Sequence, residues 1–397
     1  MKPKRYPLPF PKRYLDRRAV GIVATLAKAG FESYLVGGCV RDLLLGLRPK
    51  DYDIATAARP NQVRRLFRRS RIIGRRFKIV HVYAGRDVFE ISTFRGPPPK
   101  HQKGGTLLED NAFGTAEEDA HRRDFTINGL FLDPKVPEIL DWEKGWEGIE
   151  KKELLSIGDP EIRFKEDPVR VLRLIKFMRR MNLSAGEKEI KAARSCASLL
   201  SKAPDARVLE ELFRLMRTGD MEGVWEDLQA LKLTLRFLPE FRKWLTQENN
   251  AERMAQRFAA LDEAVQDGLS PSYSLLLAVL FGPSVEDQSQ PKKRTVRVRD
   301  QNQIAAAMIR PFQQRARLPR AEVDAAIRIL QIQPTLTAAE GPSDPAKRGR
   351  RKDWFLGESW FEDALEALRC RLIAEKEDLS GYDLWHERVL SLHQGGR

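Results

Sequence analysis

The chain has 397 residues, 42% of them hydrophobic and 32% charged, and its 70 lysines and arginines exceed its 56 acids to give a formal net charge of +14. This length exceeds a single ordinary core and predicts roughly two to four domains, and the positive charge favours a polyanionic partner, of which nucleic acid is the commonest. Three distant cysteines exclude a disulfide framework, and no run approaches the roughly eighteen apolar residues of a membrane span, so we expect a cytoplasmic protein in a reducing compartment.

The first part of the chain alternates short helices and strands. Residues 1–14 are rich in lysine, arginine and proline, and they predict a flexible basic arm that lacks the apolar core of a secretion signal. A helix is expected over residues 15–29 and a strand over 31–36. A short helix over 40–45 and a second strand over 51–55 follow.

The next elements complete a mixed domain. Pro60 suits the first turn of a helix. Two β-type runs, over residues 77–83 and 88–94, are joined by Ala84-Gly85-Arg86-Asp87, which is a good hairpin signal. A last strand is expected over 127–132. Together these elements predict an α+β unit.

After about residue 150 the pattern changes to helices, and no strand is expected there. The helices are expected over residues 167–181, 208–217, 224–231, 275–280, 303–312, 321–330 and 360–374. Polar segments with proline or glycine predict linkers near residue 249 and over 283–291 and 339–351. Residues 96–105, with three prolines and three glycines, predict a mobile loop.

Positive charge is concentrated in residues 64–78, which contain no acid. The cations there are Arg64, Arg65, Arg68, Arg69, Arg71, Arg75, Arg76 and Lys78. Like charges at this density repel one another unless an anion lies nearby, although a surface charged only for solubility is the plainer alternative. We expect nucleic acid to contact Arg64, Arg65, Arg68, Arg75 and Arg76.

The segment Gly37-Gly38-Cys39-Val40-Arg41-Asp42 is followed closely by Lys50-Asp51-Tyr52-Asp53. Alternate residues of a strand point to the same face, so Asp51 and Asp53 are expected to project together, where they can bind Mg²⁺ ions and bridge them to a triphosphate. The Gly37-Gly38 turn leaves backbone N–H groups near the phosphates, and Arg41 can hold a phosphate oxygen. Each motif alone is weak, but the two in this order are specific.

A third acid would complete metal coordination and help to deprotonate an incoming hydroxyl. Glu90 lies in the strand predicted over 88–94, next to the strand that carries Asp51 and Asp53. It is therefore the candidate for this catalytic role. The alternative is a glutamate that faces outward from a hairpin.

A densely polar segment, residues 118–129, comes just before the last predicted strand. Arg122 and Arg123 can neutralise a triphosphate. Asp124 and Asn128 can orient a sugar or brace the loop.

A second polar segment begins a helix at Pro168. Asp167 and Arg170 share a face of this helix, as do Arg170 and Arg173. The face can present a hydrogen-bonding edge to a base. The plainer alternative is a capping acid followed by surface arginines.

Several other kinds of site are missing from the sequence. It has no Gly-x-x-x-x-Gly-Lys-Ser/Thr phosphate loop and no Gly-x-Ser-x-Gly elbow. Its five histidines form no metal-ligand pattern and no His-Asp pair of a phosphohydrolase. The missing phosphate loop argues against a P-loop ATPase.

Four segments of the chain resemble the successive motifs of class II nucleotidyltransferases. They are residues 37–42, 51–53, 122–128 and 166–173. That family comprises the CCA-adding enzymes and the bacterial poly(A) polymerases, within the polymerase-beta-like superfamily. The resemblance covers about residues 33–215 and is specific, because several motifs occur in the same order.

The resemblance implies an α+β nucleotidyltransferase head followed by helical domains. The head would span residues 31–150, after a basic arm and first helix at 1–30. A helical neck that binds nucleotide and RNA (151–217), a helical body (218–284) and a basic linker with a helical tail (285–397) would follow and hold the RNA.

The resemblance also implies roles for single residues. Asp51 and Asp53 would hold two Mg²⁺ ions as metal ligands. Asp167 and Arg170, with Arg173 nearby, would choose the incoming base without a nucleic-acid template. The implied triphosphate contacts are Gly38, Arg41 and Arg123.

Residues 74–77, 91–96 and 107–119 resemble the poly(A) polymerase branch. We therefore expect addition of AMP from ATP to RNA 3′ ends, by in-line attack of the 3′-hydroxyl on the α-phosphorus. The RNA would be a messenger or regulatory RNA. The alternatives are a CCA-adding enzyme that acts on tRNA, and a non-catalytic RNA-binding protein on the same scaffold.

Overall fold

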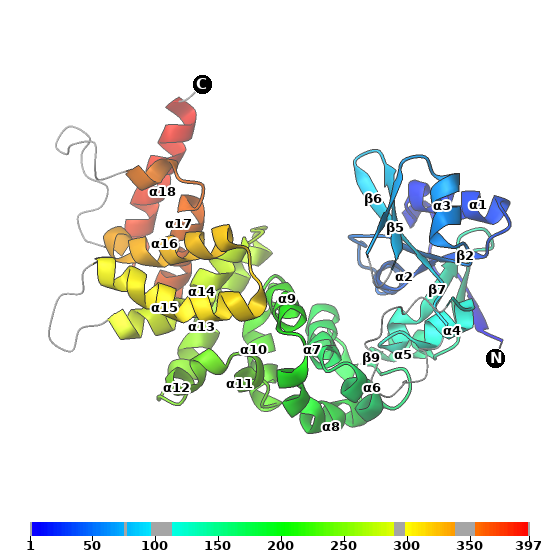
Figure 1. Cartoon of the computed structure of the whole chain (residues 1–397), viewed down its shortest axis with the longest axis horizontal. Helices are drawn as coiled ribbons and strands as arrows, with labels where there is room; N and C mark the ends of the chain where they lie inside the picture. The colour runs from blue at the N-terminus through cyan, green and yellow to red at the C-terminus, as the bar shows by residue number, and fades with distance from the viewer. Residues whose placement is uncertain (1, 75–77, 97–112, 290–297, 338–353, 396–397) are drawn as a thin grey trace. The chain divides into compact units, whose positions relative to one another are not determined.

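The computed structural model describes residues 2–74, 78–96, 113–289, 298–337 and 354–395 (Figure 1). It divides into two compact units. The first comprises Met1–Glu166 with Met181–Ala193, and the second comprises Asp167–Arg180 with Arg194–Arg397. The first unit is built around a mixed sheet and the second is helical, so the predicted fold class is confirmed.

An eight-stranded sheet organises the first unit, in the order β1-β8-β7-β2-β3-β6-β5-β4. Within this sheet β3 and β6 run parallel, and the other neighbours are antiparallel. The strands are β1 (Lys4–Pro7), β2 (Ser33–Val36), β3 (Asp53–Thr56), β4 (Ser70–Ile73), β5 (Ile79–Ala84), β6 (Asp87–Thr93), β7 (Leu130–Asp133) and β8 (Glu138–Asp141).

The first unit also contains short helices. They are η1 (Lys12–Tyr14), α1 (Arg17–Lys28), α2 (Gly38–Leu44), α3 (Pro60–Leu66), α4 (Ala116–His121), η2 (Thr126–Asn128), α5 (Gly145–Lys151), α6 (Pro160–Glu166) and most of α8 (Glu187–Cys196). A separate parallel pair, β9 (Glu153–Leu154) with β10 (Ser184–Ala185), completes the unit.

The two faces of the sheet carry two hydrophobic cores. Helix α1 turns Ala19, Ile22, Val23 and Leu26 into the first core, at the spacing of a single helical stripe. Residue Leu35 of β2 joins that core. Its neighbours Tyr34 and Val36 point to the other face, where they meet Phe94, Phe131 and α4. The strands near the acids are therefore fixed from both sides. Burial of each large side chain contributes about 1.5–3 kcal/mol.

The second unit is a set of packed helices. They are α7 (Val169–Met181), η3 (Ala197–Lys202), α9 (Asp205–Leu215), α10 (Met221–Ala230), α11 (Thr234–Phe237), η4 (Pro239–Phe241), α12 (Arg242–Leu245), α13 (Asn250–Gln266), α14 (Tyr273–Ser289), α15 (Val298–Ala316), α16 (Arg320–Thr337), η5 (Trp354–Gly357), α17 (Phe361–Glu375) and α18 (Ser380–Gly395).

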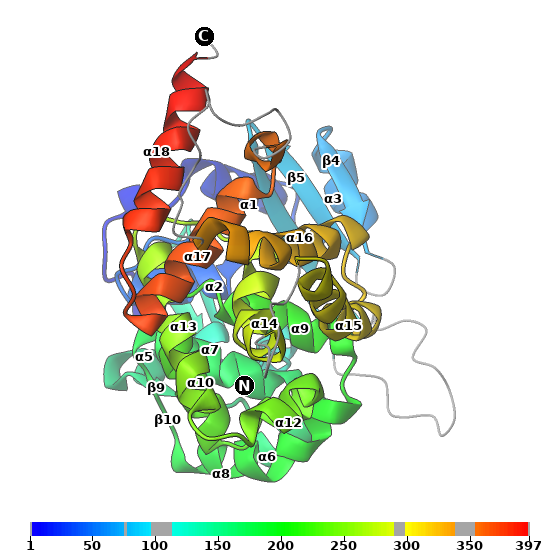
Figure 2. The same ribbon diagram turned by 90° about the vertical axis from the view of Figure 1, so that its left-hand side faces the viewer.

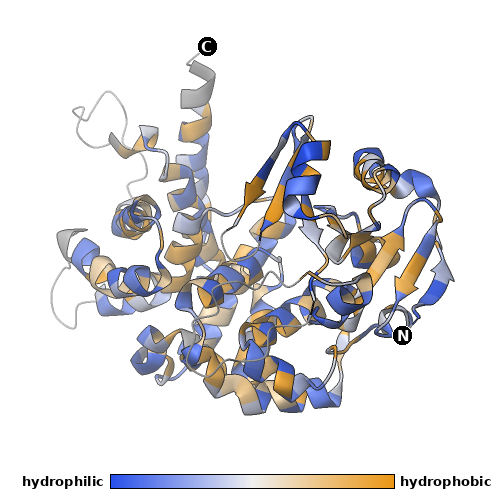
Figure 3. Cartoon of the chain, turned by 45° about the vertical axis from the view of Figure 1, so that its right-hand side comes forward, coloured by the Kyte–Doolittle hydropathy of each residue, from blue (hydrophilic) through white to orange (hydrophobic). Residues whose placement is uncertain are grey.

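Helix α14 is the centre of this packing. Every residue from Ser274 to Val285 is buried, and the helix contacts α13, α15, α16 and α17 (Figure 2). A helix that is apolar on all sides belongs in a core. Most other helices carry both hydrophobic and hydrophilic faces (Figure 3). None of the helices in the described residues is long and apolar enough to cross a bilayer.

The N-terminal segment differs from the flexible arm that was expected. Strand β1 pairs with β8, and Tyr6 stacks on Trp146 with ring centroids 4.5 Å apart. Arg5 and Lys4 form ion pairs with Glu138 and Glu147. These partners lie more than a hundred residues away along the chain, so local composition gave no sign of the strand.

The helical region also differs in several places, and helices α8, α13 and α18 lie where no helix was expected. Strands β9 and β10 occur where no strand was expected, because a two-residue pairing leaves no periodic signal. Pro283 lies inside α14 and does not begin a linker, since burial of its apolar neighbours outweighs the roughly 3 kcal/mol cost of a helical proline. The loop expected at 97–105 and the linkers at 290–291 and 339–351 lie outside the described residues.

A buried ion pair joins α7 to α9 in the second unit. Lys176 Nζ lies 2.6 Å from Glu211 Oε2, and both side chains are almost wholly buried. Burial lowers the pKa of Lys176, against the opposing effect of Glu211. The other Glu211 oxygen lies 3.0 Å from Arg214 Nη1 and 3.7 Å from Arg173 Nη1. The Glu211 carboxylate therefore forms ion pairs with three cations.

Removal of this carboxylate should be costly. We expect Glu211→Ala to lose about 3–5 kcal/mol of unfolding free energy in urea denaturation, because it leaves a buried ammonium unpaired. The double variant Lys176→Met/Glu211→Leu removes both buried charges and should recover most of the loss. The control Glu210→Ala removes an exposed ion pair to Arg214 and should cost less than about 1 kcal/mol. Equal stability of the Glu210 and Glu211 single variants would contradict the prediction.

Candidate active site

The acids expected from the sequence gather at the start of β3. Asp53 is the first residue of this strand and pairs in register with Glu90 of the parallel strand β6. Residues in register on neighbouring strands face the same side, so the two carboxylates share a face. Asp51 lies two residues before β3 and is exposed, whereas the strand was expected to begin at residue 51.

This arrangement is electrostatically unfavourable for Asp53. Its pKa is raised to about 6, first by burial and then by the charges of Glu90 and Asp51, while Arg123 and Arg41 act in the opposite direction. A cation near the three carboxylates would relieve both the burial and the repulsion. The site therefore attracts positive charge.

Glu90 is half exposed at the edge of this cluster. Its carboxylate lies 3.3 Å from His81 Nε2 on the neighbouring strand β5. The geometry thus brings Glu90 beside Asp53, as expected of a third acid. Its catalytic role stays a prediction.

The first glycine of the Gly37-Gly38 turn permits a close approach. Gly37 has φ 69° and ψ −128°, which side-chain-bearing residues rarely adopt, and it precedes α2. A Cβ atom there would lie 2.9 Å from Arg123 Nη1 and 4.0 Å from Asp53 Oδ2. The bare glycine lets the guanidinium come close to the acids.

Arg123 is held in place from several sides. Its Nη2 donates to Asp119 Oδ2 at 2.9 Å and its Nη1 to the Asn128 carbonyl at 3.3 Å. The guanidinium carbon lies 5.0 Å from the centre of the Phe131 ring. Its buried Nε has no hydrogen-bond partner among the described residues. Arg123 is therefore a preorganised cation with a donor to spare.

Arg41 lies in a buried network with the residues of η2. It donates from Nε and Nη2 to Asp42 Oδ1 at 2.9 and 2.6 Å, and from Nη1 to Asn128 Oδ1 at 2.6 Å. Asn128 Nδ2 in turn donates to Asp124 Oδ1 at 2.9 Å. The network ties α2 to η2, so both predicted nucleotide-binding segments meet beside β3. The sequence reading missed Asp42 and Asp119 as the partners that orient the arginines.

The residues predicted to read the base lie in the second unit, around the start of α7. Asp167 Oδ1 accepts from the Val169 N–H at 3.3 Å, and its Oδ2 accepts from Arg207 Nη2 at 2.7 Å. Arg173 stacks over the Phe177 ring at 5.2 Å. Asp167 therefore caps the start of α7, as the capping-acid alternative predicted. It also pairs with Arg207, which was not predicted from the sequence. Arg207 lies 40 residues away, so only the fold reveals it.

The basic cluster expected to contact nucleic acid is partly described. Arg64 and Arg65 lie exposed on α3, and Arg68 follows it, also exposed. Arg64 Nη1 donates to the Ser70 carbonyl at 3.2 Å. Arg75 and Arg76 lie outside the described residues.

The donor set at β3 fits Mg²⁺. Asp51, Asp53 and Glu90 supply carboxylate oxygens, which are the protein ligands that this hard cation prefers. Within the residues that the structure describes, no three His, Cys, Asp or Glu side chains already converge as a metal cage.

Substitution of Gly37 tests how closely this turn is packed. We expect Gly37→Ala to be less stable than the wild type in urea denaturation, by more than the roughly 1–2 kcal/mol cost of a positive φ alone, because its methyl group must displace Arg123. Gly30→Ala is the matched control, since Gly30 has φ 87° and nothing within 4 Å of the added Cβ. An equal decrease in both variants would show that the close approach of Arg123 is unimportant.

Known proteins resemble this chain over the same segments. Residues 33–155 match the family described as "Poly A polymerase head domain", and residues 187–245 match "Probable RNA and SrmB- binding site of polymerase A". Poly(A) polymerase I of Haemophilus influenzae is 38% identical over 281 residues, which cover 68% of this chain and 62% of that protein. The CCA-adding enzyme of Lactobacillus delbrueckii subsp. bulgaricus is 36% identical over 220 residues, covering 55% and 54%.

Solved structures share the fold. The CCA-adding enzyme of Bacillus stearothermophilus in complex with CTP matches with a TM-score of 0.65 and 25% identity, over 94% of this chain and 80% of that chain. The chain spans about three fifths of the length of the poly(A) polymerases it matches. The head-domain match, the relatives and the acids beside the Gly37-Gly38 turn agree, and the chain belongs to the class II nucleotidyltransferase family.

Proposed function

We propose that this chain is a poly(A) polymerase that adds AMP from ATP to RNA 3′ ends without a template. The observation that carries the proposal is the cluster of Asp51, Asp53 and Glu90 facing a preorganised Arg123 across a bare glycine. Relatives named poly(A) polymerase I, at 34–38% identity, support the choice of product.

The acids and the arginines would divide the work. Asp51 and Asp53, with Glu90, would hold two Mg²⁺ ions, which lower the pKa of the attacking 3′-hydroxyl and stabilise the leaving pyrophosphate. Arg123 would neutralise the triphosphate, and its fixed position means that little side-chain freedom is lost on binding. The N–H groups of the Gly37-Gly38 turn would add donors to the phosphates.

The hydrogen-bond network around Arg41 would fix the positions of the Gly37-Gly38 turn and of η2. Arg41 is buried and donates hydrogen bonds to Asp42 and Asn128. It would therefore position the turn and η2 even if it also donates to a phosphate. Asp124 would brace Asn128. Removal of these hydrogen bonds would misplace Arg123 and the turn together.

Base choice would come from α7 in the second unit. Asp167, Arg170 and Arg173 would present hydrogen-bonding groups to adenine, and Arg207 would orient Asp167. The helical neck, body and tail predicted at 151–217, 218–284 and 285–397 would hold the RNA. The match of residues 187–245 to an RNA-binding description supports RNA binding by the neck and body.

A CCA-adding enzyme is the second candidate function. It is favoured by relatives of that name at 36–37% identity and by structural neighbours that include a tRNA nucleotidyltransferase with a primer tRNA and an ATP analogue, 19% identical with a TM-score of 0.61. One experiment separates the two. The protein is given an RNA ending in A or a tRNA lacking CCA, with each triphosphate alone and then with all four.

Long A tails on the first RNA support the proposal. Addition to the tRNA that stops after C, C and A would replace it with the second candidate. Binding of RNA without any Mg²⁺-dependent incorporation would leave the non-catalytic alternative.

Removal of the acids should abolish turnover. We expect Asp51→Asn and Asp53→Asn each to reduce incorporation of labelled ATP by at least about a thousandfold, because Mg²⁺ loses a ligand at the reacting centre. Asp267→Asn, which changes an exposed acid of the second unit, is the matched control and should keep full activity. Chelation of Mg²⁺ should reproduce the loss in the wild type. Extension of RNA by the Asp51/Asp53 double variant would contradict the mechanism.

Nucleotide choice should depend on α7. We expect Arg170→Ala to lower the kcat/KM ratio for ATP over CTP by roughly tenfold to a hundredfold, because each missing hydrogen bond to a base is worth about 1–3 kcal/mol. The dissociation constant for RNA alone should stay within twofold to threefold of the wild-type value, by the same argument. An unchanged preference for ATP would remove Arg170 from base selection.

A further inference from the structure

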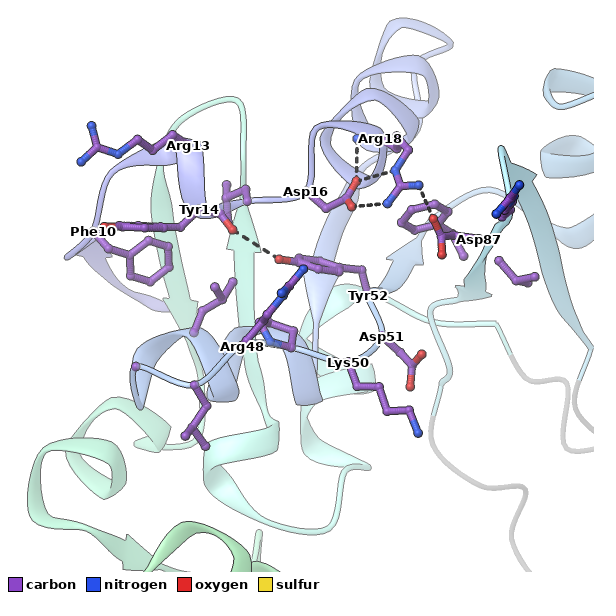
Figure 4. A pocket seen from close by; sticks show the side chains of 18 residues that line it. Phe10, Arg13, Tyr14, Asp16, Arg18, Arg48, Lys50, Asp51, Tyr52 and Asp87 are labelled. Carbon is purple, nitrogen blue, oxygen red and sulfur yellow. Dashed lines mark hydrogen bonds and ion pairs between the residues drawn. The ribbon is translucent and has the colours of Figure 1, made fainter. Parts of the chain in front are cut away.

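A pocket of about 980 Å³ lies on the first unit, next to the acids (Figure 4). Its walls come from η1 and the start of α1, from the α2–β3 connection, and from the β5–β6 turn with the start of β6. Figure 4 shows Lys50 and Asp51 at one end of it and Phe10 and Tyr14 toward the other. The pocket therefore opens beside the reacting centre, yet most of its lining takes no part in the function proposed above.

The pocket is lined by more cationic side chains than acidic ones. Arg18 is satisfied, because it pairs with both Asp16 and Asp87. The other lining cations are Arg13, Arg48, Lys50 and Arg86, all exposed. Within the described part of the chain none of these four forms an ion pair with an acid. Several unpaired cations around one pocket suit a polyanion.

Aromatic rings lie among these cations. Tyr14 is 57% exposed, and the Arg13 guanidinium lies 5.6 Å from its ring centre. Tyr52 donates from its hydroxyl to the Tyr14 carbonyl at 3.4 Å, so the two walls are linked. Phe10 packs edge-on to Tyr14, with ring centres 6.4 Å apart. Exposed rings between unpaired cations are the usual means of binding single-stranded nucleic acid, by stacking on bases and neutralising the backbone.

The occupant must fit both features. A single nucleoside triphosphate brings only one base and one cluster of phosphates, whereas the cations come from several walls and the volume exceeds that of one nucleotide. A single strand carries phosphates and bases in alternation, and its 3′ end would lie beside Asp51 at the pocket's edge. We propose that this pocket binds a single-stranded segment of the RNA, 5′ to its reacting end, with a base on Tyr14 and backbone phosphates at Arg13, Arg48 and Lys50. The proposal rests on the proposed function for the identity of its ligand.

Binding without turnover tests the pocket. The probe is a fluorescent ten-residue oligoadenylate, titrated with the full-length chain without ATP or Mg²⁺. We expect Arg13→Glu/Arg48→Glu to weaken binding at least roughly tenfold and to reduce the slope of log affinity against log salt by about 1.4, or about 0.7 for each phosphate that the protein no longer neutralises. Lys28→Glu/Lys135→Glu makes the same change of charge at exposed residues of this unit outside the pocket, and it should stay within about threefold.

Stacking gives a second, independent readout. Tyr14→Ala should weaken binding of the oligoadenylate roughly tenfold but leave binding of an abasic strand of equal length unchanged, whereas Tyr14→Phe should bind both like the wild type. Tyr14 is exposed, so its replacement does not disturb a core.

Three results would overturn the inference. Equal RNA affinity of the pocket and control double variants would show that the strand binds elsewhere. A raised KM for ATP with unchanged RNA affinity would assign the pocket to the triphosphate. Equal effects of Tyr14→Ala on the two strands would exclude stacking. A chain that binds RNA through these residues but never incorporates ATP would keep the pocket and refute the polymerase, so the two failures are distinguishable.

Discussion

The parallel pairing of β3 with β6 is the constraint on which the site depends. It sets Asp53 in register with Glu90 and so places two carboxylates on one face, with a third just before the strand. Burial and like charge both disfavour the ionised form of Asp53. Placing these carboxylates side by side contributes nothing to the stability of the sheet. The fold maintains it because both faces of β3 are anchored by large buried side chains.

Each of the two arginines near the acids is paired with an acid of its own. Asp42 orients Arg41 and Asp119 orients Arg123. The second unit repeats the device, with Arg207 on Asp167 and Glu211 near Arg173. Such pairs fix a side chain before any ligand arrives, so less conformational freedom is lost on binding. In a strongly basic chain, the same pairs also hold these arginine side chains in one position, where unpaired ones would move freely in solvent.

Sequence reasoning succeeded where the signal is local. The Gly37-Gly38 turn and the hairpin through residues 84–87 each concern neighbours in the chain, and the predicted elements there lie within a few residues of the observed ones. It failed where the cause is distant. Arg207 is brought to Asp167 by the fold from 40 residues away, and no local pattern marks it. Pro283 was misread because burial on all sides of α14, which only packing reveals, outweighs a local helix-breaking signal.

The strand β1 has a consequence for how the chain acquires its structure. Its pairing partner, β8, begins more than a hundred and thirty residues later. At a synthesis rate of about 5–20 residues per second, β8 is made roughly 7–27 seconds after β1. During that interval β1 and the η1 segment behind it have no sheet edge to join. The wall that carries Phe10 and Tyr14 is therefore among the earliest parts of the first unit to be made and among the last to be set in place.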